Sequence, residues 1–169
     1  MRADPASGDQ GLSYAFVRVH DDETVLAAQL VQLGDQHCSE HEIYHVARDL
    51  LAWSQDNLAR IVDTAARYEV RLSSTPGLEA AHKYGQLLDP MRDRQPSAAG
   101  LGLLEDLRTC YLLASGCSLS WELLAQYAQA RRETDILALA GYCHPRTLRQ
   151  MRWANTMLKT QSPQALTNL

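Results

Sequence analysis

The absence of proline from Asp21 to Thr75 constrains the fold most strongly. Proline breaks a helix interior, so its absence leaves this stretch free to be helical throughout. Apolar residues recur here at steps of three, four or seven, the spacing of one helix face. They are Leu26, Leu30, Leu33, Tyr44, Leu51, Leu58, Val62 and Ala65. The sequence therefore predicts an all-α fold with this stripe facing the core.

Two signals divide the stretch. Gly34-Asp35 weakens the helical pattern, and Ser39-x-x-Glu42 matches a capping box that starts a new helix. We therefore predict a first helix at about 22–36 and a second at about 40–69, with Ser39 as the cap. A single kinked helix is the alternative.

Two further helices are predicted after a connection over about 70–99 that is rich in proline, glycine and serine. One runs over about 101–130 and the other over about 134–159, with a tight turn between them and a kink at Pro145. Their predicted core faces carry Leu104, Leu107, Tyr111, Ala114, Trp121 and Leu124, and then Ile136, Leu137, Ala140, Leu148, Met151 and Met157. Residues 1–20 are predicted to form a partly flexible tail, which leaves 21–165 as the bundle domain.

The order of connections is short, long, short. Short links join antiparallel neighbours, and one long crossover between the second and third helices is the arrangement of ferritin-like bundles. The predicted fold is therefore an up-down four-helix bundle, ferritin-like, with this crossover.

The composition is that of a globular protein, with 46% hydrophobic residues and a net charge of -4. Mild acidity argues against a nucleic-acid partner, and no apolar run is long enough for a signal peptide or a membrane span. The four cysteines show no C-x-x-C spacing, which favours reduced thiols. These features predict a cytoplasmic protein without a membrane partner.

The densest cluster of candidate ligands is His37-Cys38-Ser39-Glu40-His41-Glu42-Ile43-Tyr44-His45. On a helix each step of four residues climbs about 6 Å, so two successive histidines can hold one ion and all three cannot. Glu42-x-x-His45 also has the spacing by which di-iron bundles present a carboxylate and an imidazole together. Such ligands suit iron, manganese or another first-row divalent metal. The predicted metal ligands are His41, Glu42 and His45, with His37, His144 and Glu122 as further ligands.

Two other interpretations of this cluster exist. The histidines are equally compatible with a solvated helix start, where they cap and hydrogen-bond. His41-Glu42-Ile43-Tyr44-His45 also matches the H-E-x-x-H pattern of zinc proteases. A protease of that kind offers its substrate an edge strand, and this chain shows almost no strand pattern.

The segment from His37 to Trp53, with the ending Cys143-His144-Pro145-Arg146-Thr147-Leu148-Arg149-Gln150-Met151-Arg152-Trp153, resembles a group of small actinobacterial proteins of unknown function with ferritin-like helical patterns. The resemblance covers about residues 21–165 and implies a bundle with a metal site. The ligand pattern of the ferritin-like superfamily carries over onto Glu42 and His45, and less closely onto Glu23 and either Glu105 or Glu122. The fourth helix lacks the Glu-x-x-His of that pattern, which argues against an oxygen-activating, metal-dependent oxidoreductase.

Two functions therefore stay open. The leading hypothesis is a ferritin-like bundle that binds one or two first-row metal ions. The alternative is a metal-free interaction bundle that pairs with itself or with another protein. Its motivation is the polarised charge, acidic over 1–46 and basic over 131–159, together with the three tryptophans, Trp53, Trp121 and Trp153.

Overall fold

The computed structural model describes residues 5–72 and 99–167, with side chains from Gln10 onward. These residues form four long helices: α1 (Pro5–Gln36), α2 (His41–Arg67), α4 (Ala99–Arg131) and α5 (Thr134–Thr167). The helices pack together, and none of the described residues is in a strand. The predicted all-α four-helix bundle is confirmed. The part of the chain expected to hold most of the long connection lies outside the described residues.

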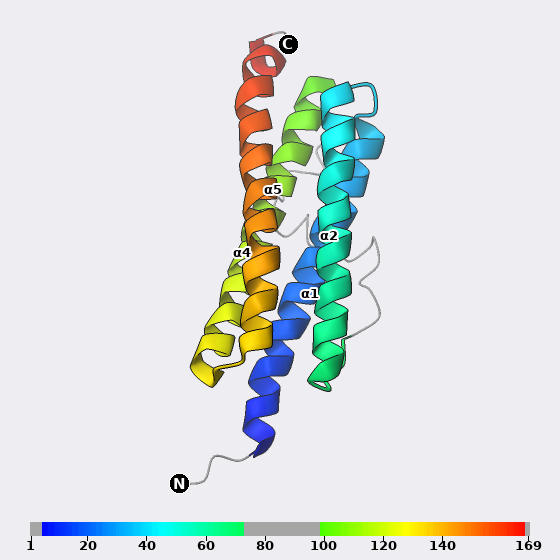
Figure 1. Ribbon diagram of the computed structural model, residues 1–169. Coiled ribbons are helices and arrows are strands. Elements are labelled where there is room, and N and C mark those ends of the chain that lie inside the picture. Colours follow the sequence, from blue (N-terminus) through cyan, green and yellow to red (C-terminus); the bar gives the residue numbers. More distant parts are fainter. Residues whose placement is uncertain (1–4, 73–98, 168–169) are drawn as a thin grey trace.

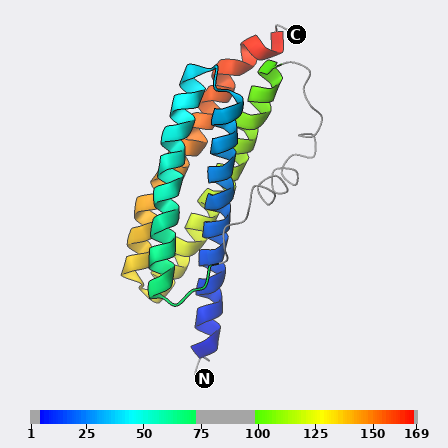
Figure 2. The ribbon, with the colours of Figure 1, turned by 90° about the vertical axis from the view of Figure 1, so that its right-hand side faces the viewer.

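The helices run up, down, down and up (Figures 1 and 2). α1 packs against α2 and α4, and α5 packs against α4 and α2, so the diagonal pairs are α1 with α5 and α2 with α4. α2 ends and α4 begins at opposite ends of the bundle (Figure 1). Every pair of neighbouring helices is therefore antiparallel. Among these pairs, α2 and α5 are in contact least.

Each helix buries one stripe of residues that alternates steps of three and four. This spacing averages 3.5 residues, the period of helices that pack at a shallow angle around a shared core. The stripes are Leu12, Phe16, Val19, Glu23, Leu26, Leu30 and Leu33; Ile43, Ala47, Leu50, Ser54, Asn57, Ile61 and Thr64; Leu103, Leu107, Cys110, Ala114, Cys117, Trp121, Leu124 and Ala128; and Ile136, Ala140, Cys143, Thr147, Gln150, Ala154 and Met157.

The buried stripe of α2 lies one residue away from the predicted one. Tyr44, Leu51 and Leu58 are only partly buried, and Val62 is 50% exposed. The prediction of these positions was wrong because the true stripe contains three polar residues, and a pattern of apolar residues at helical spacing does not include them. On the later helices Leu104, Tyr111, Leu148 and Met151 are also partly buried, and Leu137 is exposed.

α1 begins at Pro5, within the segment predicted to be a tail. Leu12, Phe16 and Val19 are buried in the core at helical spacing, so this segment packs as part of the bundle from at least Leu12. Glycine and serine, common in this segment, concealed the apolar stripe between them.

The predicted break between the first two helices is confirmed, since α1 ends at Gln36 and α2 starts at His41. The proposed cap is wrong. Glu40, not Ser39, is the N-cap residue of α2, and no side chain makes a capping hydrogen bond there. The single-kinked-helix alternative is excluded.

The tight turn between α4 and α5 is confirmed, since α4 ends at Arg131 and α5 begins at Thr134. α5 continues through Pro145 and Pro163 to Thr167, beyond the predicted end. Across residues 5–72 and 99–167, no helix has the length and apolarity that crossing a membrane would require.

Candidate functional site

A layer of polar side chains crosses the middle of the core. α1 contributes Glu23, α2 contributes Ser54 and Asn57, α4 contributes Cys117, and α5 contributes Thr147 and Gln150. Each occupies a position of the buried stripe where an apolar residue would ordinarily stand. All four helices therefore direct hydrogen-bonding groups to the bundle centre, which is where helical bundles build ligand and metal sites.

Glu23 is the ionisable group of this layer and is fully buried. Its Oε2 atom accepts three hydrogen bonds, from Trp121 Nε1 at 3.2 Å, Cys117 Sγ at 3.3 Å and Asn57 Nδ2 at 3.4 Å. These donors come from α2 and α4, the two helices that flank α1. The carboxyl group is thus held in one orientation by groups that all donate to the same oxygen.

Burial raises the pKa of Glu23 above its ordinary value of 4.5, and the polar side chains around it, Ser54, Cys117, Trp121 and Asn57, oppose this shift. Burial and the neighbouring Glu23 carboxylate also hold the pKa of the Cys117 thiol well above 9.0. The Cys143 thiol reaches a pKa of about 12 for the same two main reasons. Both thiols therefore stay protonated at neutral pH, and Cys117 is a hydrogen-bond donor.

Three oxygen atoms of the layer lack a hydrogen-bond partner. Glu23 Oε1, Thr147 Oγ1 and Gln150 Oε1 are buried and have no hydrogen-bond partner. The Cys117 thiol lies between Glu23 and Thr147, and Ser54 lies between Glu23 and Gln150, whose Nε2 donates to Ser54 Oγ at 2.9 Å. A buried polar atom without a partner costs about 1–3 kcal/mol. Three such oxygens in one layer, one of them from the Glu23 carboxyl group, make this layer the candidate site for a ligand.

The layer does not fit a di-iron centre. Such a centre takes a Glu from each of two helices and a Glu-x-x-His from each of the other two. Here Ser54-x-x-Asn57 on α2 and Thr147-x-x-Gln150 on α5 have the same spacing, but they supply hydroxyl and amide groups. The layer thus offers one carboxylate and neutral oxygens, a donor set suited to a hard cation of low charge rather than to iron.

Arg146 links this layer to the surface between α2 and α5. Its Nη1 atom lies 2.5 Å from Asp56 Oδ2 and 3.4 Å from Asn57 Oδ1. Asn57 is the residue whose amide donates to Glu23. Two hydrogen bonds in series therefore connect the half-exposed Asp56–Arg146 pair to the buried carboxyl group.

An aromatic ring steadies this connection. The Arg146 and Arg60 guanidinium groups lie over the Tyr142 ring, 4.2 and 4.1 Å from its centroid, and Arg60 Nε donates to Asp56 Oδ2 at 2.9 Å. The two arginines lower the pKa of Asp56, chiefly through their hydrogen bonds. Asp56 is therefore ionised at neutral pH and holds both cations.

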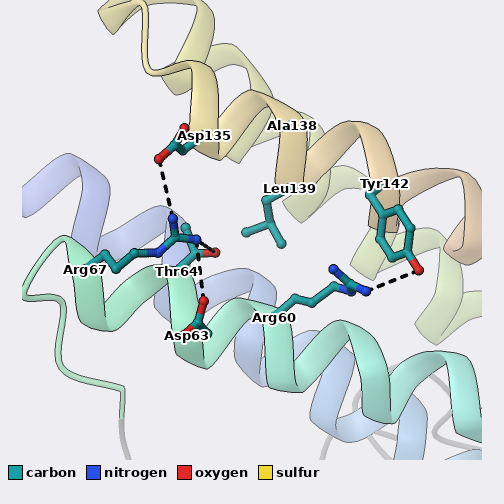
Figure 3. A pocket seen from close by; sticks show the side chains of 8 residues that line it. All are labelled: Arg60, Asp63, Thr64, Arg67, Asp135, Ala138, Leu139 and Tyr142. Carbon is teal, nitrogen blue, oxygen red and sulfur yellow. Dashed lines mark hydrogen bonds and ion pairs between the residues drawn. The ribbon is translucent and has the colours of Figure 1, made fainter.

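A groove of about 410 Å³ lies beside this cluster, between α2 and α5 (Figure 3). Arg60 and Tyr142 line one end of it. At the other end Arg67 contacts Asp63 at 3.5 Å and Asp135 at 3.4 Å. Acids balance bases along this groove, so it has no charge preference of its own. The groove matters because it lies along the seam between α2 and α5, the two neighbouring helices that are in contact least.

The histidine cluster of α2 lies elsewhere. His41, Glu42 and His45 are all exposed. The His41 and His45 rings stack with their centroids 6.0 Å apart. These two side chains therefore lie next to each other, as predicted. Ser54 follows His45 by nine residues, about 14 Å along the helix, so the pair is far from the polar layer.

The other predicted ligands are engaged in separate places. His37 Nε2 lies 2.8 Å from Asp106 Oδ2 and joins the turn after α1 to α4. His144 Nε2 lies 2.8 Å from Ser118 Oγ, and its Nδ1 lies 3.7 Å from Glu122 Oε1. Within the part of the chain that the structure describes, no three His, Cys, Asp or Glu side chains come together in a way that could hold a metal ion.

His144 and His41 are far apart. Arg146 meets Asp56, which places His144 near that level of the bundle. Asp56 follows His41 by fifteen residues, about 22 Å of helix. The two histidines therefore do not share an ion.

Most of the polar layer was missed by the sequence prediction, which named Glu23 only as a weak match. A usable signal was present. Glu23 continues the alternating step from Phe16 and Val19 to Leu26 and Leu30, so a charged residue occupies a position that the pattern reserves for the core.

Comparison of the chain with protein-family models, with curated proteins and with solved structures finds no match. The candidate site therefore has to be interpreted from its own geometry.

Proposed function

We propose that the protein is a ferritin-like bundle that binds one monovalent cation, sodium or potassium, in its core at Glu23. The observation that carries this proposal is the set of three buried oxygens without partners, Glu23 Oε1, Thr147 Oγ1 and Gln150 Oε1. A cation bound in this layer would have these three oxygens as its candidate ligands.

Charge balance favours a monovalent ion. The layer contains one carboxylate, and burying a net charge is costly, so a single positive charge leaves the core neutral. A proton on Glu23 meets the same requirement, and proton and cation would compete for the same oxygen. The up, down, down, up order of the helices supports the ferritin-like assignment, while the neutral donors set this site apart from an iron centre.

The test is thermal unfolding in buffers that differ only in the cation, with sodium or potassium chloride against choline chloride at equal ionic strength. A ligand at one hundred times its Kd stabilises by about 2.7 kcal/mol, which for this size raises Tm by about 5–10 °C. Glu23→Gln should abolish the shift. Glu122→Gln removes the same charge from an exposed position and should retain it. Equal melting in all three salts would overturn the proposal.

A second candidate is a first-row divalent ion on His41 and His45, with Glu42 nearby. The stacked pair of exposed imidazoles favours it, since two histidines one turn apart can hold one ion from one face. Zinc or manganese titration of protein purified without a nickel column tests it. Loss of binding in His41→Ala, with binding kept in His144→Ala, supports this surface site; no saturable binding rejects it.

The interaction bundle has one observation in its favour. Leu119 and Leu123, one turn apart on α4, are 67% and 49% exposed, an unusual placement for a pair of leucines. A second copy of the chain is the partner we consider. Sedimentation equilibrium tests it, with Leu119→Glu expected to reduce the mass and Leu137→Glu on α5 as control. A wild-type monomer at all concentrations rules this function out.

A further inference from the structure

We propose that the seam between α2 and α5 is the entrance to the Glu23 site, and that Arg146 is the positioning residue that keeps it closed. This inference rests on the proposed function only for what enters. The opening itself follows from the contacts along the seam.

The seam is the weakest of the four helix–helix contacts. Near the surface it is crossed by polar interactions: Arg146 to Asp56, Arg60 to Tyr142, Arg67 to Asp135 and Tyr68 to Glu133. In the core, Gln150 Nε2 on α5 donates to Leu50 O and Ser54 Oγ on α2. Polar pairs near the surface each contribute little to the free energy that holds two helices together. Separation of α2 from α5 breaks these surface pairs and the two Gln150 hydrogen bonds, but it parts the two helices that are in contact least. Separation of α1 from α4 breaks the buried Glu23 bonds to Cys117 and Trp121 and parts a more extensive contact.

Arg146 is the crossing residue that connects the surface of the seam with the polar layer. Its side chain is 20% exposed, against 46% for Arg60 and 54% for Arg67. The same Nη1 atom contacts Asp56 at the surface and Asn57 below it. Loss of Arg146 would leave Asn57 Oδ1 without this donor and would remove the Arg146 contacts that cross the seam.

The groove along this seam lies on the path from the surface to the polar layer. Tyr142, the ring under Arg146, also lines the groove with Arg60 and Leu139 (Figure 3). Cys143, the residue next to Tyr142, is buried beside Glu23. A small outward movement of α2 therefore connects the groove with the polar layer.

Cysteine labelling measures this opening directly. Cys117 lies in the polar layer and Cys143 lies beside Glu23. Cys110 is buried seven residues before Cys117, about 10 Å away along α4. In a Cys38→Ser background, which removes the exposed thiol, the rate of N-ethylmaleimide addition at each cysteine is followed by peptide mass spectrometry. Opening of the seam exposes Cys143 and Cys117 and leaves Cys110 covered.

Arg146→Ala is expected to accelerate labelling of Cys143 and Cys117 at least tenfold and to leave Cys110 unchanged. Arg146 lowers the pKa of the Cys143 thiol, whose net shift is upward because of burial. Its removal alone would therefore slow the reaction, and a faster rate reports exposure. Arg149→Ala is the matched control, because Arg149 is exposed and makes no ion pair with the described residues.

Asp56→Asn provides a milder variant if Arg146→Ala does not fold, and it should accelerate the same two cysteines. Equal acceleration of all three cysteines would show global destabilisation and overturn the inference, as would unchanged rates in both variants. Selective labelling without any cation effect on Tm would leave the entrance in place and reject the proposed cation. A cation effect with uniform labelling would do the reverse.

Discussion

Glu23 shows how one residue can set the pH response of a whole domain. Burial raises its pKa in the folded state, so folding favours its protonated form. The stability associated with that proton is complete below the unfolded pKa of about 4.5 and is lost as pH rises through the folded pKa.

Glu23→Gln should therefore match the wild type at low pH and exceed its stability increasingly as pH rises, until the folded pKa is passed. Urea unfolding between pH 4 and 8, in buffer free of sodium and potassium, measures the difference. Asp56, whose pKa is lowered, has the opposite pH dependence but is common to both proteins. A Glu23→Gln difference that is constant with pH would contradict this prediction.

For single residues, the sequence predicted which side chains lie next to each other better than it predicted which of them are buried. His41 and His45 do lie together, because four residues make one helical turn. Their exposure was not predictable, since it depends on which stripe of α2 faces the core. Ser54 and Asn57 had little signal of their own, because single polar residues in a helix usually face solvent.

At the level of the helices, the C-terminal ends of α2 and α4 have the same backbone geometry. At the end of α4, Glu133 N donates to Ala128 O and Arg132 N donates to Gln129 O, with Arg132 at φ 60°. Val70 and Glu69 repeat these bonds after α2, with Glu69 at φ 57°. Both are Schellman motifs in which a non-glycine residue occupies the left-handed position.

Arg132→Gly should therefore stabilise the protein by about 1 kcal/mol, because a left-handed conformation costs other residues about 1–2 kcal/mol. Arg131→Gly, one residue earlier and inside the helix, should destabilise it by about 1 kcal/mol. Guanidinium unfolding of the pair checks both signs. A loss of stability in Arg132→Gly would show that its side chain contributes more than the strain.

The start of α2 offers a second test at this scale. Glu40 is the N-cap without a capping side-chain bond, and aspartate is among the preferred residues there. Glu40→Asp should raise stability by about 0.5–1 kcal/mol, measured by thermal unfolding. Ser39→Ala should change it by less than about 0.5 kcal/mol; a larger loss would restore Ser39 as the cap.

Helices were predictable where apolar residues and turn signals agreed. The boundaries at Gln36, Arg131 and Thr134 follow from such agreement. The start of α1 was not predictable, because glycine and serine separate its core residues Leu12, Phe16 and Val19. The continuation of α5 through Pro145 depends on packing against its neighbours, which a local propensity does not include.

For the whole molecule, the four helices of the described residues followed from the sequence, and so did the short connections from α1 to α2 and from α4 to α5. Connection length indicates which helices are neighbours, since short links force antiparallel contact. The contact of α1 with α4 joins residues far apart in the chain, such as Glu23 and Trp121. No local pattern encodes such a contact.

Because this contact joins the two halves of the chain, we expect the protein to reassemble from two separate segments. Residues 1–72 hold one helical pair and residues 99–169 the other, and each part supplies some of the partners of Glu23. Expressed alone, each part would expose its core stripe and should have little helical structure. Mixed in equal amounts, the two should restore the helical circular dichroism and bury Trp121, visible as a blue shift of its fluorescence in a Trp53→Phe, Trp153→Phe background. The chain would then serve as a split reporter, whose signal depends on two separate polypeptides meeting.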